Sequence, residues 1–258
     1  MTAMARRSSG NARGPVATNI ASCRRGADLE REGVPGISVI IPTLNEADSL
    51  VETVRRAKAN PEVSEVIVVD AGSEDRTKAI AEELGCRVVN GPRSRGGQLR
   101  LGAAQARGDV VLLLHADTWL PPNAGRAALE CLRGNGVAAG AFWKAFRDPH
   151  VLMRGSRLRC GLRLWLCGRV LGDQAMFVRR ELLEQIGGVP DVALMEEFEL
   201  CRRLRRVGRL SLANATVTTS ARRFHQRGVL RTYWRMGLVT IRYWLGASPE
   251  ELRRLYEK

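Results

Sequence analysis

The chain has 258 residues, of which 45% are hydrophobic, enough to bury the core of one large domain with appendages. Its formal net charge of +14 at pH 7 indicates an anionic partner: nucleic acid, an anionic membrane surface or a phosphate-bearing substrate. The six cysteines form no CxxC pair and no zinc-ligand spacing with histidine, which excludes a zinc finger and predicts reduced thiols in the cytoplasm. No apolar run is long enough to span a membrane.

The first 36 residues are rich in Ser, Gly, Ala and Arg and lack the apolar run of a secretory signal. We therefore expect residues 1–36 to form a flexible basic leader. Residues 37–221 should form the main domain, and the Arg- and Trp-rich residues 222–258 should form amphipathic C-terminal helices.

The first half of the domain alternates short apolar runs with helical patterns. Strands are predicted at 37–41, 66–69, 87–89 and 109–114, and helices at 46–59, 77–84 and 98–106. Nearly continuous apolar strands that alternate with helices indicate an α/β fold with a mostly parallel sheet covered on both faces. Ligands of such sheets lie beyond the carboxyl ends of the strands, so polar residues at these ends are candidate site residues.

The pattern changes beyond Pro121 and Pro122. A helix is expected to about Leu132, followed by a strand at 136–146, an amphipathic helix at 151–171, a strand at 176–178 and a helix at 194–207. The tail from 228 to 246 alternates Trp, Tyr, Leu and Arg.

Two aspartates lie at the ends of apolar runs. At the end of the fourth predicted strand, Asp117 could hold Mg²⁺ or Mn²⁺, which in turn bridges the phosphates of a leaving nucleoside diphosphate. Asp70, after the second strand, could accept hydrogen bonds from a nucleobase or ribose. The alternatives are that Asp117 caps the next turn and that Asp70 is a turn residue before Gly72.

Glu196 and Glu197 begin a predicted helix. An acceptor that attacks an anomeric carbon needs a carboxylate base opposite the leaving group, and one of these two acids could point into the cleft to supply it. The alternative is that acidic residues simply suit a helix N-terminus and pair with Arg202 or Arg203.

Two further segments carry candidate polar contacts. Arg93 and Arg95 lie in a Gly-rich loop and could bind a diphosphate, although a solvated loop would look the same. Asp173 and Gln174 lie in a turn before the strand at 176–178 and suit contacts with a donor or acceptor sugar.

Four segments together resemble the family 2 glycosyltransferases. They are Ile-Pro-Thr-Leu-Asn-Glu (41–46), Val-Val-Asp-Ala-Gly-Ser-Glu-Asp-Arg-Thr (68–77), Ala-Arg-Gly-Asp-Val-Val-Leu-Leu-Leu-His-Ala-Asp-Thr (106–118) and Met-Glu-Glu-Phe-Glu-Leu-Cys-Arg-Arg-Leu (195–204). The Leu-His-Ala-Asp-Thr form is similar to a bacterial subgroup with members named as carotenoid-acid (diaponeurosporenoate) glycosyltransferases. The resemblance implies the GT-A fold, a nucleotide-sugar donor such as a UDP-sugar, a divalent metal (Mg²⁺ or Mn²⁺), and inversion at the anomeric carbon.

The resemblance also implies roles for individual residues. Glu197 takes the place of the catalytic carboxylate, and Asp117 that of the metal-binding second Asp of Asp-x-Asp. The expected nucleotide-sugar contacts are Pro42, Thr43, Asn45, Glu46, Asp70, Gly72, Arg93, Arg95 and Asp117. The expected acceptor or sugar pocket comprises Asp173, Gln174 and Glu196. His115 stands where the first Asp is usual, so that a single carboxylate would anchor the metal.

The segments 151–171 and 222–246 combine arginines with tryptophans. Such stretches suit a peripheral membrane surface, with arginines at anionic headgroups and Trp165, Trp234 and Trp244 in the interface. The alternative is a set of ordinary core helices with solvated arginines. A lipid or carotenoid-acid acceptor would fit a cytoplasmic protein on the inner face of the cell membrane.

Two other functions fit the sequence less well. A GT-A-like nucleotidyltransferase usually has a Gly-rich loop and a Lys after its first strand, whereas Pro-Thr-Leu-Asn-Glu follows here. A non-enzymatic nucleic-acid-binding protein would explain the charge, but no RNP, zinc-finger or helix-turn-helix signature is present, so no nucleic-acid partner is expected. A dinucleotide-dependent dehydrogenase would need a GxGxxG motif after the first strand, and none follows it.

Overall fold

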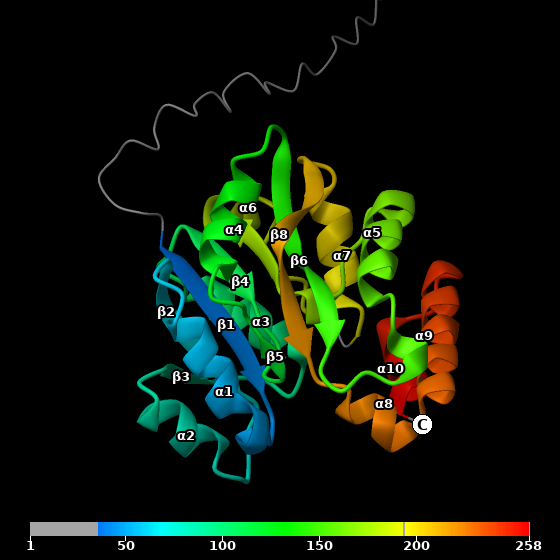
Figure 1. Cartoon of the computed structure of the whole chain (residues 1–258), viewed down its shortest axis with the longest axis horizontal. Helices are drawn as coiled ribbons and strands as arrows, with labels where there is room; N and C mark the ends of the chain where they lie inside the picture. Colours follow the sequence, from blue (N-terminus) through cyan, green and yellow to red (C-terminus); the bar gives the residue numbers. More distant parts are fainter. Residues whose placement is uncertain (1–35, 193, 258) are drawn as a thin grey trace, which may run out of the picture. The chain divides into compact units, whose positions relative to one another are not determined.

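The computed structural model describes residues 36–192 and 194–257 (Figure 1). Apart from Gly36, the predicted leader 1–36 therefore lies outside the described residues. The described chain belongs to one compact unit, Val34–Lys258.

The elements alternate in the first half of the chain and become mixed later. The strands are β1 (Ile37–Thr43), β2 (Val63–Asp70), β3 (Arg87–Asn90), β4 (Val110–Leu113), β5 (Thr118–Trp119), β6 (Val137–Phe146), β7 (Met176–Arg179) and β8 (Arg209–Thr219). The α-helices are α1 (Ala47–Lys58), α2 (Thr77–Glu83), α3 (Arg95–Ala104), α4 (Ala124–Leu132), α5 (Ser156–Cys167), α6 (Arg180–Gln185), α7 (Glu196–Leu204), α8 (Arg222–Arg227), α9 (Val229–Trp244) and α10 (Pro249–Glu257). Short 3-10 helices are η3 (Val151–Met153) and η4 (Gly172–Gln174).

Within the described residues the strands form one eight-stranded sheet in the order β3-β2-β1-β4-β7-β6-β8-β5. The four strands from β3 to β4 are parallel, whereas β7 is antiparallel to both β4 and β6. The chain moves outward from β1 to β3 on one side and then crosses to β4 on the other. Such a reversal opens a crevice at the carboxyl ends of β1 and β4, where ligands of parallel sheets bind.

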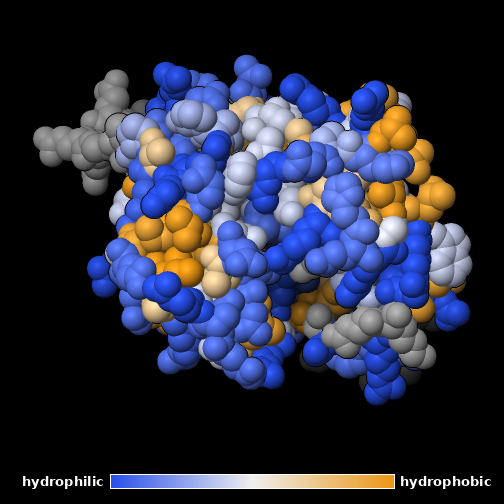
Figure 2. All heavy atoms as spheres, turned by 60° about the horizontal axis from the view of Figure 1, so that its bottom comes forward, coloured by the Kyte–Doolittle hydropathy of each residue, from blue (hydrophilic) through white to orange (hydrophobic). Residues whose placement is uncertain are grey.

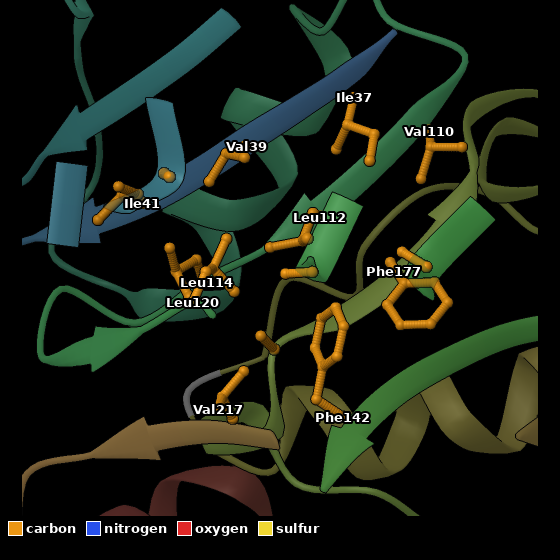
Figure 3. Close-up of a cluster of buried hydrophobic side chains, with 14 of the residues drawn as sticks. Ile37, Val39, Ile41, Val110, Leu112, Leu114, Leu120, Phe142, Phe177 and Val217 are labelled. Atoms are coloured by element: carbon orange, nitrogen blue, oxygen red, sulfur yellow. The ribbon is translucent and has the colours of Figure 1, made fainter. Parts of the chain in front are cut away.

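Helices cover both faces of the sheet, as the apolar strands predict. Val39 and Ile41 of β1 point to the face covered by α1, α2 and α4, and Figure 3 shows the side chains buried on this face. Ile40 points to the other face, beneath α3, α6 and α7. Alternate residues of one strand are therefore buried on opposite sides, which explains why the strands read as unbroken apolar runs. The expected α/β fold with a mostly parallel sheet is confirmed.

Helix α3 begins at Arg95, three residues before its predicted start. The side chain of Ser94 accepts a hydrogen bond from the amide of Gly97 at 3.3 Å and so caps the helix. At Gly102 a Cβ would lie 2.3 Å from Cγ2 of Ile40, so this glycine permits the helix to approach β1 closely. The predicted start was late because two glycines, 96 and 97, interrupt the apolar pattern.

The single helix predicted at 151–171 is wrong. The structure contains η3, a break, and then α5, which is bounded by Gly155 (φ 76°) and Gly168 (φ 60°). These left-handed glycines end the helical path at each side, which a periodicity of apolar residues cannot reveal. Strand β8 and helix α6 were not predicted.

The C-terminal helices α8, α9 and α10 pack on the sheet domain through two small apolar clusters. Phe224 of α8 contacts Phe146 at the end of β6, and Tyr243 of α9 meets Phe198 of α7 edge-on with ring centroids 5.5 Å apart. Met195, directly before α7, belongs to the same cluster as Val239 of α9. Among the described residues no helix has the length and apolar content needed to cross a membrane.

Candidate active site

The loop after β2 is organised by a fully buried carboxylate, that of Asp70. Its Oδ1 accepts hydrogen bonds from the amides of Gly72 (2.9 Å) and Ser73 (2.8 Å), and its Oδ2 accepts from the hydroxyls of Thr43 (3.1 Å) and Ser73. Burial by itself would raise the pKa of Asp70, but these hydrogen bonds outweigh it and lower the pKa below its ordinary value. The carboxylate stays ionised and ties the ends of β1 and β2 together.

This arrangement changes the role expected for Asp70 and Thr43. Both side chains are buried, at 0% and 2% exposed, and their polar atoms bond to each other. In this structure they hold the ends of β1 and β2 together and do not present their polar atoms to a ligand. Direct contact with a base or ribose stays a prediction that would require the loop to open.

The surface of this edge is formed by the neighbouring loop residues. Asn45 adopts a left-handed backbone (φ 55°), and its side-chain oxygen accepts from the amide of Glu74 at 2.8 Å. Gly72 is exposed with φ 86°, and the guanidinium of Arg93 lies beside it, donating to the carbonyl of Ala71 at 3.3 Å. The residues with φ above zero allow the chain to turn sharply where a ligand would approach.

Two other predicted contacts border the same edge. Pro42, near the end of β1, is half-buried. Glu46 pairs with Arg222 of α8 across 3.3 Å, which connects the loop after β1 to the C-terminal helices.

Gln98 belongs to this edge but was not predicted. Its buried side-chain amide donates to the carbonyls of Thr43 (2.9 Å) and Val69 (2.6 Å), at the ends of two neighbouring strands. A buried amide that bonds two strand ends fixes their separation. The signal in the sequence was a polar residue on the otherwise small and apolar inner face of α3.

Asp117 lies between β4 and β5, at the crevice. Its backbone carbonyl accepts from Arg147 (3.1 Å) and from the amide of Ser220 (3.2 Å), which fixes the backbone. The half-buried carboxylate accepts no hydrogen bond from residues 36–192 or 194–257. It is therefore available to a ligand, in contrast to that of Asp70.

No group of three or more His, Cys, Asp or Glu residues within the described chain could hold a metal ion. A lone carboxylate nevertheless fits Mg²⁺ or Mn²⁺ that is shared with a substrate, because Mg²⁺ is usually bound by one or two carboxylates, waters and substrate phosphates. Asp117 is the residue that fits this role.

Arg95 is surrounded by the acidic residues of the predicted site. Its Nε lies 3.0 Å from Oε1 of Glu196, whose side chain is nearly buried. Burial lowers the pKa of the Arg95 guanidinium, but the negative charges of Glu196, Glu197, Asp173 and Asp117 outweigh this and raise it. The cation thus lies among four predicted site residues that come from three different segments.

A small cavity brings this group together. The residues around it include Arg95, His115, Glu196 and Glu197, together with Leu113 of β4 and Leu200 of α7. His115, which replaces the first Asp of the expected motif, therefore faces the same space as the candidate base.

Glu197 has the most strongly perturbed carboxyl group of this site. Burial, followed by the negative charge of Glu196, raises its pKa from 4.5 to about 7, although Arg95 opposes the shift. Glu196 takes the ion pair with Arg95, so that the two adjacent carboxylates have different partners. A carboxyl with a pKa near neutrality can accept a proton during a reaction at physiological pH.

The backbone before these two acids is strained. Met195, a buried residue at the N-cap of α7, has φ 67°. A left-handed conformation costs a non-glycine residue about 1–2 kcal/mol. It turns the chain directly before Glu196 and Glu197, which both line the cavity.

Asp173 and Gln174, the predicted sugar contacts, have different surroundings in the structure. Asp173 pairs with Lys144 through Oδ2 at 2.6 Å, while its buried Oδ1 has no hydrogen-bond partner in the described chain. Gln174 is completely buried, and its amide donates to the carbonyl of Phe142 and accepts from the amide of Leu171. The expectation that Gln174 lines a sugar pocket is therefore not met here, because its polar atoms support the β6–β7 junction.

The structure thus joins Arg95, Glu196, Glu197 and Asp173 in one group and places Thr43, Asn45 and Asp70 at an adjacent edge. Lys144 is a further member that the sequence analysis missed. The sequence indicated it only as a single charged residue in the otherwise apolar strand β6.

Comparison with known proteins agrees with this geometry. The model of a family described as "Glycosyl transferase family 2" matches residues 38–187, more than half of the chain. The chain belongs to glycosyl transferase family 2. It is accordingly an enzyme, which excludes the alternative of a non-enzymatic nucleic-acid-binding protein.

Curated relatives match part of this family 2 chain. A protein of Edwardsiella ictaluri named undecaprenyl-phosphate 4-deoxy-4-formamido-L-arabinose transferase is 30% identical over 155 residues, which cover 55% of the chain and 48% of the relative. A protein of the same name from Pseudomonas paraeruginosa is 39% identical over 98 residues, 33% of the chain and 29% of the relative. The chain spans about half or less of the length of these relatives.

Two solved structures have a similar fold. A mannosyltransferase from Pyrobaculum calidifontis, in complex with GDP-Man and Mn²⁺, has a TM-score of 0.61 at 22% identity and covers 80% of this chain and 61% of its own. Glucosyl-3-phosphoglycerate synthase from Mycobacterium tuberculosis, in complex with Mn²⁺, UDP and glucosyl-3-phosphoglycerate, has a TM-score of 0.54 at 24% identity. The match covers 72% of this chain and 70% of the synthase. At these identities the similarity supports the GT-A fold.

Proposed function

We propose that this family 2 enzyme transfers a sugar, with inversion, from a nucleoside-diphosphate donor to an acceptor that Glu197 deprotonates. The observation that carries the proposal is the raised pKa of Glu197, about 7, in a cavity that also contains Arg95 and His115. A base of this pKa can take a proton from an acceptor hydroxyl as the hydroxyl attacks the anomeric carbon.

We assign the donor to the edge formed by Pro42, Asn45, Glu46, Gly72 and Arg93. Thr43 and Asp70 would hold this edge in shape through their mutual hydrogen bond. Arg95, the first residue of α3, follows Arg93 by two positions, and its positive charge would attract the diphosphate.

Asp117 would hold a divalent cation together with the donor phosphates. The similar structures from Pyrobaculum calidifontis and Mycobacterium tuberculosis contain Mn²⁺ with GDP-Man and with UDP, respectively, and another of the latter contains Mg²⁺ with UDP. When bound, the cation would neutralise the charge that develops on the leaving diphosphate. A UDP-sugar is our first candidate donor.

The acceptor is expected to be a lipid or lipid-linked molecule. The curated relatives are named as undecaprenyl-phosphate sugar transferases, which supports a lipid acceptor more directly than the carotenoid acid suggested by the subgroup resemblance. The partnerless Oδ1 of Asp173 suits a hydroxyl of the sugar or acceptor, since a buried acceptor without a donor is costly. We accordingly place the enzyme at the cytoplasmic membrane surface.

Donor binding can be tested directly by thermal unfolding of the full chain with UDP- and GDP-sugars, with and without Mn²⁺. We expect one donor to raise the Tm only when Mn²⁺ is present, and release of the matching nucleoside diphosphate once a lipid acceptor is added. If no donor shifts the Tm in Mn²⁺ or Mg²⁺, the donor-site assignment is wrong.

A further inference from the structure

Helix α9 is apolar on two opposite faces. Its inner face carries Val239, which is 3% exposed, together with Met236 and Tyr243, and packs on the domain. Its outer face consists of Leu230 (73% exposed), Trp234 (70%), Ile241 (58%), Trp244 (60%) and Leu245 (77%). A surface helix of a globular protein normally has one apolar face and a polar one opposite.

The outer residues form a continuous stripe. At about 100° per residue, steps of three and four residues return to the same side of a helix, and positions 230, 234, 237, 241 and 244 follow such steps. Gly237, in the middle, has no neighbour within 4 Å of where a Cβ would be. The stripe is therefore uncovered from Leu230 to Ile241, while at its end the guanidinium of Arg169 lies over the ring of Trp244, 4.0 Å from the centroid, and leaves that side chain 60% exposed.

Helix α5 has a second uncovered stripe. It consists of Leu158 (68% exposed), Leu162 (44%), Trp165 (80%) and Leu166 (68%). The two helices are bridged, since Arg159 donates to the hydroxyl of Tyr233 at 3.2 Å. Figure 1 places both helices on the right, and Figure 2, which is turned about the horizontal axis, shows apolar surface on that side. We call the outer stripes of α9 and α5 the docking face.

The two helices of the docking face carry charge of one sign. Helix α9 contains three arginines, α5 contains three, and neither helix contains Asp or Glu. Arg231 and Arg242 flank the α9 stripe, are exposed, and form no ion pair with any described residue. Uncompensated cations beside exposed tryptophans match the chemistry of anionic headgroups above an acyl layer.

We propose that the docking face binds the anionic surface of a lipid bilayer, with Trp234 and Trp244 in the headgroup region and Arg231 and Arg242 at lipid phosphates. A second copy of the chain is a poorer occupant, because a symmetric contact would bring these arginines together without an acid to compensate them. A nucleic acid would pair with the arginines but leave Leu230, Trp234 and Ile241 in water.

The position of α9 connects this surface to the site. Tyr243, on the inner face, packs against Phe198, one residue after Glu197. A bilayer bound to the outer face would therefore lie one helix away from the segment that carries the candidate base. The idea that the bilayer supplies the acceptor rests on the proposed function. Binding of the docking face to lipid does not depend on it.

The test is flotation of the full chain with vesicles, without donor or metal. The protein should float with vesicles of equal parts phosphatidylcholine and phosphatidylglycerol, and much less with phosphatidylcholine alone. Arg231→Gln with Arg242→Gln should weaken binding about fivefold for each arginine. Trp234→Ser with Trp244→Ser should abolish it, and the blue shift of tryptophan fluorescence on vesicle addition should disappear.

Arg126→Gln with Arg133→Gln is the matched control, because these exposed arginines belong to α4 and the residue that follows it, on the opposite face of the sheet. This variant should bind as the wild type does. The proposal is overturned if the wild type does not bind anionic vesicles, or if the tryptophan variant binds equally well. A wild-type dimer that the tryptophan changes dissociate, without vesicle binding, would assign the face to a second copy. Donor binding measured separately would show whether the proposed function had failed too.

Discussion

Asp117 and Glu197, the candidate metal ligand and the candidate base, have carboxylates in opposite surroundings. That of Asp117 is half-buried and accepts no hydrogen bond from a described residue, so it suits a cation. That of Glu197 is buried beside the negative charge of Glu196, which raises its pKa and favours the protonated form. Arg95 pairs with Glu196 at 3.0 Å, so that Glu196 and Glu197 differ in their partners.

Asp117→Asn preserves the size of the side chain and removes its charge. We expect the Mn²⁺-dependent part of donor binding to disappear, because the amide is a poor ligand for a hard cation. Titration of the donor by calorimetry, with and without Mn²⁺, measures this effect. Glu130→Gln, which changes an exposed residue of α4, is the control. If donor binding by the Asp117→Asn variant depends on Mn²⁺ as in the wild type, the metal assignment is wrong.

Glu197→Gln should reduce turnover by about 10²–10⁴-fold while leaving donor affinity unchanged, because only the proton acceptor is lost. In the wild type kcat/KM should rise with pH and level off above about 7, since the carboxyl must be ionised to act. The variant should lose this dependence. Weakened donor binding in the variant would argue against a base.

The Glu197 carboxyl also makes the free energy of unfolding depend on pH, in a direction that follows from its raised pKa. Since the pKa of Glu197 is higher in the folded state than in the unfolded chain, the folded state binds more protons, and the free energy of unfolding falls as pH rises from 4.5 to about 7. Glu197→Gln should show less of this fall in urea titrations. An equal fall in both proteins would mean that the folded-state pKa is not raised.

At the scale of elements, the strand ends of β1 and β2 are held by a side chain from α3. Gln98→Met should lower the free energy of unfolding by about 1–3 kcal/mol, because two buried carbonyls lose a donor. Urea unfolding measures the effect, and Gln226→Met, on the exposed side of α8, should change it little. If Gln98→Met is neutral, the amide does not fix the strand ends.

The sequence predicted those elements whose signals are local. Runs such as Ile37–Ile41 are apolar because the parallel strands are buried on both faces, and their ends placed Asp117 and Asp70 near the crevice. The partners of these carboxylates were not predictable, because Ser73, Thr43 and Asp70 meet only through the turn that they build. Strand β8 was missed because its alternation, with Leu210, Ala213 and Val217 buried, includes small and polar residues.

At the scale of the whole molecule, the C-terminal helices complete the surroundings of the active-site segment. Leu252 of α10 is 1% exposed and belongs to the cluster that holds Met195 and Phe198. No periodicity in the sequence could reveal this contact, because it joins segments that are far apart along the chain.

Leu252→Ala should lower the free energy of unfolding by about 2–5 kcal/mol and also reduce kcat below the transition temperature, since the backbone before Glu196 loses support. Leu132→Ala is the matched control: Leu132 is 3% exposed and ends α4. It should destabilise similarly without affecting kcat. If both variants retain full kcat, the C-terminal helices do not position the site.

Three residues with left-handed backbones, Asn45, Ala175 and Met195, lie in or beside the predicted site. A sequence chosen only to make this backbone as stable as possible would place glycine at Ala175 and Met195. Stability-driven redesign would therefore change the loops of the candidate site first. A redesign that aims at stability should keep these positions fixed, because a substitution there can raise the Tm without improving activity.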